Sequence, residues 1–175
     1  MYENKIITEP KWKSWIIQTT TPLFTPDQCN QIIASGRAQK PQQAQVGINK
    51  PGGGTNTKKR VTTISWIPFQ EMGHMYQDLN KFIQQANENH FGFGDIRVTE
   101  QAQFTEYPEG GFYDWHMDCD VNMEHEPPVR KISMTLLLND PSEFEGGDLE
   151  LMAPGKYANL KQGHAICFAS FLNHR

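Results

Sequence analysis

The chain has 175 residues, a length that suits one domain and leaves little room for two. Hydrophobic residues make up 37% of it, and 16 Lys and Arg against 20 Asp and Glu give a net charge of −4. This composition predicts a globular core. The acidic balance argues against binding of nucleic acid through bulk charge, and no apolar run is long enough to span a membrane.

The cysteines and the first residues of the chain indicate in which cellular compartment the protein is expected. Cys29, Cys119 and Cys167 are too few and too scattered for a disulfide framework or a cysteine-rich zinc site. The opening residues lack the apolar stretch of a signal peptide. We therefore expect a reducing, cytoplasmic environment.

Two helices are predicted in the first half of the chain. Thr25 suits an N-cap and Pro26 the first helical position, so a helix is expected from Pro26 to Gly36. Residues 69–87 carry apolar side chains at helical spacing, which predicts an amphipathic helix. Extended segments are expected at residues 12–20 and 60–67.

A long segment without a regular pattern, residues 37–59, separates the first helix from the strand that follows. Gln, Asn, Gly, Pro and Lys dominate it. Loops of this length are uncommon in compact domains and are often functional. Two interpretations stay open: residues 40–59 form a lid over a site, or the segment is a surface excursion.

The second half of the chain is predicted to be β-structure. Clusters of Gly, Pro, Asn and Asp separate segments that alternate polar and apolar side chains. The expected strands are residues 96–107, 112–119, 130–138, 148–152 and 165–172. The order of helices and strands predicts a mainly β fold with flanking helices.

One of these strands places Ser133 and Thr135 on a polar face and apolar side chains on the other. The polar face is either a solvated outer surface or the interior of a barrel that holds a polar ligand.

The segment 107–118 is the richest in chemistry-bearing side chains. His116 and Asp118 lie two apart, so on a strand both leave the same face and can bind one ion. A third imidazole would complete a two-histidine, one-carboxylate set, which is typical of non-haem Fe(II) that binds further ligands. His164 and His174, before and after the last predicted strand, are both candidates. Asp114 and Asp120 are alternatives to the carboxylate of Asp118.

Four segments of the chain stand out as motifs: Tyr107-x-x-Gly-Gly-x-Tyr-x-x-His-x-Asp118, Arg130–Asn139, Phe144–Leu149 and Gly163–His174. In this order they resemble 2-oxoglutarate- and Fe(II)-dependent oxygenases, and among these the prolyl 4-hydroxylase-like branch with its bacterial and phage PKHD-type hydroxylases. The resemblance implies a double-stranded β-helix, or jelly roll. We expect a single domain over residues 1–175, with helical and strand support in 1–95 and the jelly-roll core in 96–175.

The resemblance also implies a site. It implies Fe(II) bound by His116, Asp118 and His174, with Tyr107 and Thr135 binding 2-oxoglutarate and with O2 as the oxidant. Ascorbate is compatible with it as an additional reductant. Further aromatic side chains either line a substrate groove or pack in the core: Trp66, Tyr113 and Trp115. Arg60 either serves that groove or pairs with a carboxylate.

The implied activity is hydroxylation of an unactivated C–H bond with conversion of 2-oxoglutarate to succinate. Fold and cofactor do not by themselves fix a substrate. By analogy with the prolyl 4-hydroxylase-like branch, we expect the substrate to be a prolyl residue in a peptide or protein. Two other classes stay open: a zinc hydrolase with the same ligands, and a catalytically silent jelly-roll binding module.

The sequence departs from the family pattern at one point. In the family, a basic residue on the strand after the distal histidine pairs with the far carboxylate of 2-oxoglutarate. Here Arg175 directly follows His174 and is the last residue given. We expect the last strand of the jelly roll, with this residue, to be missing from the sequence given.

Overall fold

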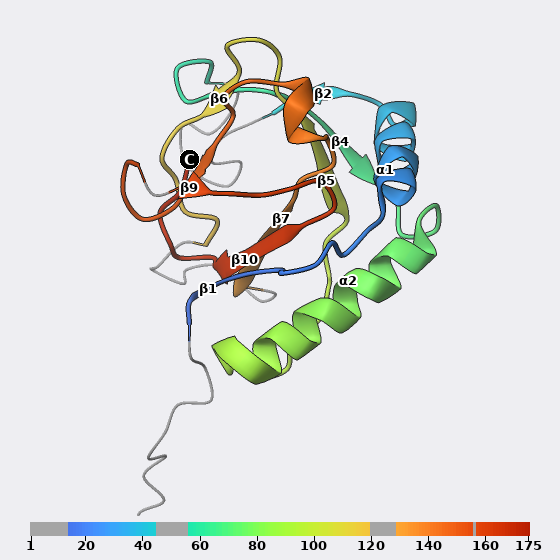
Figure 1. Ribbon diagram of the computed structural model, residues 1–175, viewed down its shortest axis with the longest axis vertical. Helices are drawn as coiled ribbons and strands as arrows, with labels where there is room; N and C mark the ends of the chain where they lie inside the picture. Colours follow the sequence, from blue (N-terminus) through green and yellow to red (C-terminus); the bar gives the residue numbers. More distant parts are fainter. Residues whose placement is uncertain (1–13, 45–55, 120–128, 156) are drawn as a thin grey trace, which may run out of the picture.

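A computed structural model of the chain describes residues 14–44, 56–119, 129–155 and 157–175 (Figure 1). Its strands pair antiparallel throughout the described residues. One sheet has the order β1-β10-β7, with β1 at Ile16–Gln18, β10 at Ala165–Ala169 and β7 at Ile132–Leu136. A second has the order β2-β4-β5, with β2 at Gln42–Gln43, β4 at Thr63–Ile67 and β5 at Ala102–Glu106.

Two shorter pairings complete the described β-structure. β3 (Arg60–Val61) pairs with β6 (Phe112–Tyr113), and β8 (Leu149–Glu150) pairs with β9 (Tyr157–Ala158). A 3-10 turn, Pro141–Glu143, follows β7. The described strands are between two and five residues long.

The first helix, α1, spans Pro26–Ala38 and begins as the sequence predicts. The side chain of Thr25 accepts a hydrogen bond from the backbone N–H of Gln28, and the Gln28 side chain accepts one from the backbone of Thr25. At the other end, Gly36 lies directly on the ring of Phe104 in β5, where a Cβ would come within 2.3 Å of the ring. The missing side chain therefore lets α1 lie close to the second sheet.

The second helix, α2, spans Gly73–Ala86 and continues as a π-helical turn over Asn87–Phe91. It lies along the lower edge of the molecule in Figure 1, below β1 and β10. The phenol of Tyr76 donates to the carbonyl of Ile67 in β4 and accepts from the backbone of Ala102 in β5. This one side chain thus ties the helix to two neighbouring strands.

The core has one large cluster between the helices and the second sheet, and two smaller ones around β10. Every residue of β10 is buried. The large cluster contains Phe24, Cys29, Ile32, Ile67, Met75, Tyr76, Leu79 and Phe104. The fold is therefore a β-structure with two helices packed against it, as the sequence predicts.

The predicted elements differ from the observed ones mainly at their boundaries. The expected strand 60–67 is divided, because Arg60–Val61 pairs with β6 whereas Thr63–Ile67 pairs with β2 and β5. The expected strand 112–119 is regular only over Phe112–Tyr113. β2 lies within the segment predicted as a loop, and residues 45–55 of the predicted lid lie outside the described residues.

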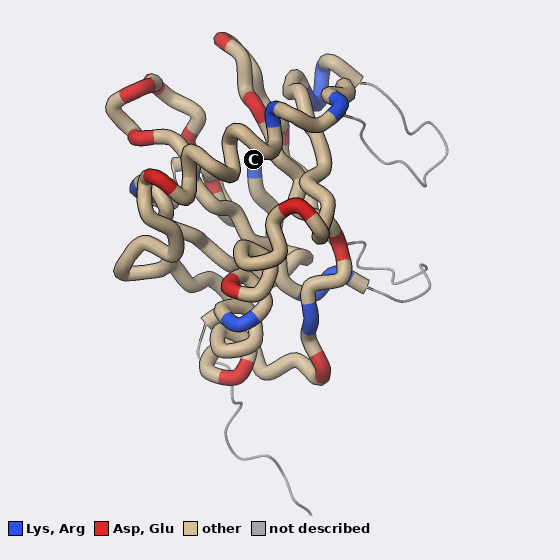
Figure 2. The backbone as a smooth tube through the Cα atoms, turned by 90° about the vertical axis from the view of Figure 1, so that its right-hand side faces the viewer, with Lys and Arg blue, Asp and Glu red and all other residues tan. Residues whose placement is uncertain are grey.

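The spread of charged residues and the character of the described helices agree with the composition of the chain. In Figure 2, acidic and basic positions are interspersed over the tube. Among the described helices, none combines the length and the apolar character needed to cross a membrane. Cys29 and Cys167 are buried free thiols.

Gly163 generates the first testable prediction. It has a φ of +75°, and a Cβ at this position would lie 2.0 Å from the carbonyl oxygen of Phe24. Gly163→Ala should lower the free energy of unfolding by about 2–5 kcal/mol, from left-handed strain and backbone overlap together. Urea denaturation measures this loss.

Gly146→Ala is the matched control. Gly146 has a similar φ of +71° but open space around it, so the loss should be only about 1 kcal/mol. Equal losses for the two variants would contradict the close approach at Gly163.

Candidate metal centre

Two segments far apart in the sequence pair at the candidate centre. The backbone N–H of His116 donates to the carbonyl of His174 at 2.9 Å, and the N–H of His174 donates to the carbonyl of His116 at 2.9 Å. The N–H of Asp118 donates to the carbonyl of Ser170, just after β10. The centre is thus built on backbone hydrogen bonds, although residues 114–119 form no regular strand.

These hydrogen bonds bring three potential ligands together. One donor atom each of His116, Asp118 and His174 lies within 4.8 Å of the other two. The Oδ1 atom of Asp118 is 3.6 Å from the Nε2 of His116 and 3.8 Å from the Nε2 of His174. We call these three residues the triad.

The backbone also sets the tautomer of both imidazoles. The Nδ1 of His116 is 2.8 Å from the carbonyl oxygen of Asp114, and the Nδ1 of His174 is 3.0 Å from that of Leu172. A carbonyl oxygen only accepts, so each Nδ1 carries the proton and donates. Both Nε2 lone pairs therefore face the carboxylate of Asp118, which is the arrangement of a metal ligand with an oriented second nitrogen.

The second oxygen of Asp118 is occupied by neighbouring side chains. Its Oδ2 accepts a hydrogen bond of 2.5 Å from the hydroxyl of Ser133 in β7 and lies 3.5 Å from the guanidinium of Arg130. The Ser133 hydroxyl is itself 3.0 Å from that of Ser170. Both serines are buried, so the network fixes the carboxylate and leaves Oδ1 turned toward the imidazoles.

Electrostatics favours the protonation states that a metal requires. Burial alone would raise the pKa of Asp118, but the neighbouring His116, the hydrogen bond from Ser133 and the charge of Arg130 together outweigh it and hold this pKa well below its usual value. Burial, together with the neighbouring His116, lowers the pKa of His174. At neutral pH the centre therefore offers an ionised carboxylate beside a neutral imidazole.

An aromatic ring and a cation extend the centre on one side. The ring of Tyr113 in β6 stacks on the imidazole of His116, with centroids 3.5 Å apart. The guanidinium of Arg60 in β3 lies 4.3 Å from the centroid of the same Tyr113 ring. Pairing of β3 with β6 places Arg60 opposite Tyr113, which explains the contact.

The alternative ligands from the sequence lie elsewhere. The imidazole of His164 is hydrogen-bonded at its Nδ1 to Thr19, on the N-terminal side of β10. Asp114 lies near Lys59 and is separate from the triad. Asp120 lies outside the described residues. Of the two candidate histidines, the structure brings His174 to His116 and Asp118.

The other residues predicted for the site differ in their exposure and in their contacts with the triad. Tyr107 is 53% exposed, and Thr135 is exposed on β7, on the same strand face as Ser133. The guanidinium carbon of Arg175 lies over the Trp115 ring, 5.2 Å from the ring centroid. Of the predicted groove aromatics, Tyr113 is the one stacked on a triad residue.

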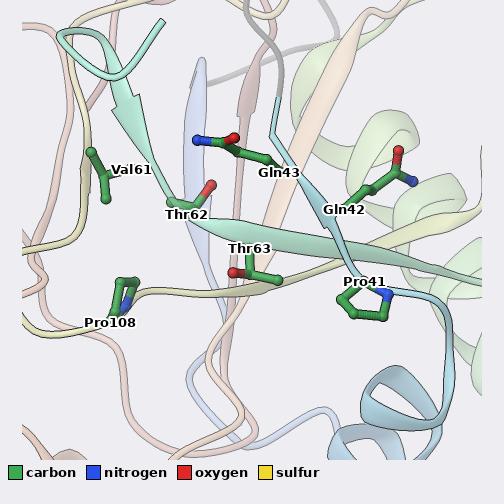
Figure 3. A pocket seen from close by; sticks show the side chains of 7 residues that line it. All are labelled: Pro41, Gln42, Gln43, Val61, Thr62, Thr63 and Pro108. Carbon is green, nitrogen blue, oxygen red and sulfur yellow. The ribbon is translucent and has the colours of Figure 1, made fainter. Parts of the chain in front are cut away.

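A cavity of about 350 Å³ opens beside this region rather than at the triad. Figure 3 shows Pro41, Gln42 and Gln43 on one side of it and Val61 and Pro108 on the other, with Thr62 and Thr63 between them. None of the triad residues lines it. It borders the centre indirectly, because Thr62 hydrogen-bonds Arg60 and Pro108 follows Tyr107.

Sequence reasoning missed three residues around the triad, Arg130, Ser133 and Ser170, and it left the role of Arg60 open. Ser133 had a usable signal, because it shares the polar strand face with Thr135, and the structure shows that this face looks toward Asp118. Arg60 and Arg130 each head or precede a strand, a position that does not by itself indicate a site.

Comparisons with known proteins agree with this geometry. Residues 102–175 match the profile of the 2OG-Fe(II) oxygenase superfamily. The chain is 32% identical over 84 residues to a PKHD-type hydroxylase of Acidovorax ebreus (strain TPSY), an alignment that covers 45% of this chain and 37% of that protein. It is also 32% identical over 80 residues to a PKHD-type hydroxylase of Prochlorococcus marinus, covering 45% of this chain and 35% of the relative. The alignments thus span little more than a third of the length of either relative.

Solved structures share the fold. A prolyl-4-hydroxylase of Pseudomonas putida superposes with a TM-score of 0.64 at 20% identity, covering 91% of this chain and 83% of that one. A viral collagen prolyl hydroxylase from Paramecium Bursaria Chlorella virus-1, in its 2OG complex, gives 0.67 at 17% identity, covering 92% and 87%. At these identities the likeness concerns the fold alone, and the predicted jelly roll is confirmed.

The hydrogen bond from Ser133 to Asp118 generates the second prediction. Ser133→Ala should weaken binding of Mn(II) about tenfold or more, because Oδ2 of Asp118 loses the donor that orients the carboxylate. Calorimetric titration of the metal measures this effect without any turnover.

Ser65→Ala is the matched control, since Ser65 is equally buried and donates to the carbonyl of Gly36, away from the triad. It should lower thermal stability and leave Mn(II) affinity unchanged. A Ser133→Ala variant that binds Mn(II) as tightly as the unaltered protein would show that the hydroxyl does not position Asp118.

Proposed function

We propose that this protein is an Fe(II)- and 2-oxoglutarate-dependent dioxygenase whose iron is bound by His116, Asp118 and His174. Support comes from the match of residues 102–175 to the profile of the 2OG-Fe(II) oxygenase superfamily. The observation that carries the proposal is the geometry of the triad. The Oδ1 of Asp118 lies less than 4 Å from the Nε2 of each imidazole, and one ligand atom of each residue lies within 4.8 Å of the other two. Without a cation between them, two lone pairs and an anion in such an arrangement repel.

The chemistry of the ligands fits divalent iron. Two imidazoles and one carboxylate occupy one side of a metal ion and leave other positions open, which suits an iron that also binds a keto acid and O2. When bound, iron with these two molecules supplies the oxidation of a C–H bond and the conversion of 2-oxoglutarate to succinate and CO2. The residues of the chain supply the geometry in which this occurs.

Each neighbouring residue has a defined task in this proposal. The carbonyls of Asp114 and Leu172 hold the imidazoles in the tautomer that exposes Nε2. Ser133 and Arg130 hold the second oxygen of Asp118, so that the carboxylate offers a single oxygen to iron. Tyr113 covers one face of His116 and shields that side of the centre from water.

The substrate we propose is a prolyl residue in a peptide or protein. Support comes from the names of the similar proteins, which are PKHD-type hydroxylases and prolyl hydroxylases. The cavity beside β2 and β4, lined by the seven residues of Figure 3, is our candidate for the place where such a peptide binds. Tyr107 and Thr135 remain our predicted residues for 2-oxoglutarate.

The third prediction tests the ligands. His116→Ala and Asp118→Ala should each abolish succinate formation from 2-oxoglutarate with added Fe(II), because each removes a ligand. His164→Ala is the control, since His164 bonds Thr19 away from the triad and should retain turnover. A proline-rich peptide should raise turnover in the unaltered protein.

Two outcomes would contradict the proposal. The first is turnover at the unaltered rate in either ligand variant. The second is a purified protein that retains zinc and does not convert 2-oxoglutarate when iron is supplied, which would favour a hydrolytic zinc site.

A further inference from the structure

The turn between β10 and His174 carries hydrogen-bond acceptors for two of the three triad residues. The carbonyl of Ser170 accepts from the backbone N–H of Asp118 at 3.0 Å, and the carbonyl of Leu172 lies 3.0 Å from the Nδ1 of His174. The hydroxyl of Ser170 is also 3.0 Å from that of Ser133, which donates to Asp118. The position of this turn therefore sets the position of a carboxylate and of an imidazole together.

Trp15, the residue before β1, contacts this turn from a distant part of the chain. Its backbone carbonyl accepts from the N–H of Ala169 at 3.0 Å, and its indole meets the ring of Phe171 edge to face, with centroids 5.2 Å apart. β1 runs antiparallel beside β10, which brings Trp15 to the end of β10 (Figure 1). One residue thus holds the chain on both sides of Ser170, by its backbone at residue 169 and by its side chain at residue 171.

A helical segment holds Trp15 in turn. The indole ring lies 6.1 Å from the ring of Phe93, which follows the π-helical turn at the end of α2. The side chain of Asn87, the first residue of that turn, accepts from the N–H of Phe93 at 2.9 Å and donates to its carbonyl at 3.0 Å. Trp15 therefore connects the end of the helical layer to the turn that precedes His174.

The geometry points to Trp15 as a positioning residue for the metal centre, which acts through Phe171 and the backbone of the turn. If the turn shifts, the carbonyl of Leu172 moves away from the imidazole of His174 that it orients. Groups that orient metal ligands from behind contribute about 10- to 100-fold to metal affinity. This inference rests on the proposed function, because it assumes that the triad binds a divalent metal.

The experiment measures equilibrium binding of Mn(II) by calorimetric titration, beside urea denaturation of the same proteins. Trp15→Leu removes the aromatic contact with Phe171, and Trp15→Phe keeps a ring at that place. Phe69→Leu is the matched control, since Phe69 is also a half-buried aromatic residue, and its ring contacts Tyr76 at the large core cluster instead of the turn.

Both leucine variants should unfold at lower urea concentration, because each loses an aromatic contact. Only Trp15→Leu should also weaken Mn(II) binding, by about tenfold, whereas Phe69→Leu should bind Mn(II) as the unaltered protein does. Trp15→Phe should bind Mn(II) within about threefold of the unaltered protein, because a ring still packs against Phe171. A purely structural role for Trp15 would lower stability without this change in metal affinity.

A double-variant cycle tests whether the effect passes through Phe171. Phe171→Leu should weaken Mn(II) binding about as much as Trp15→Leu, and the variant with both changes should bind no more weakly than either single variant. If Trp15→Leu does not fold, Phe171→Leu decides the matter, because it removes the other ring of the same contact and leaves Trp15 in place.

Three results would overturn the inference. One is binding of Mn(II) by Trp15→Leu and Phe171→Leu as tight as by Phe69→Leu. Another is a pair of losses that multiply in the double variant, which would show that Trp15 does not act through Phe171. The last is an unaltered protein that does not bind Mn(II), which refutes the proposed function itself and is recognised before any variant is compared.

Discussion

The reciprocal hydrogen bonds between the backbones of His116 and His174 are the constraint on which the candidate centre depends. They join residues that are far apart in sequence, and they do so at the residues whose side chains carry the ligands. Each imidazole then bonds back to the carbonyl two residues before its own, so the same backbone fixes ring orientation and tautomer. The side chains have little freedom left to lose when a ligand binds.

This arrangement explains why part of the centre could be predicted from the sequence. His116 and Asp118 are close in the chain, and their spacing already indicates a shared face. The third ligand was harder, because His164 and His174 stand at opposite ends of β10 and local chemistry does not choose between them. The choice depends on the turn after β10, where Leu172 bonds back to Ala169 and the chain returns to residue 116. Family resemblance selected His174, and the structure brings that residue to the other two.

Contacts between strands account for what the sequence did not reveal. Ser133 meets Asp118 and Ser170 only because β7 and β10 pair in one register, and a shift by one residue would turn its hydroxyl away. The division of the predicted strand 60–67 has the same origin, since pairing partners decide which sheet each part joins. The helices were predicted more accurately than the strands, because the cap at Thr25 and the helical spacing of apolar residues in α2 are local features of the sequence.

The distribution of charge around the triad gives the site a different character from the chain as a whole. The protein as a whole carries a net charge of −4. Near the triad, the charge of Arg130 is paired with Glu100 and lies close to Asp118. The single negative charge of Asp118 would compensate only half of the charge of the proposed divalent ion. If the proposed divalent ion is bound, one positive charge remains uncompensated at the triad. Attraction between opposite charges is strong where water is excluded, so the proposed metal centre would favour a negatively charged ligand over a neutral one.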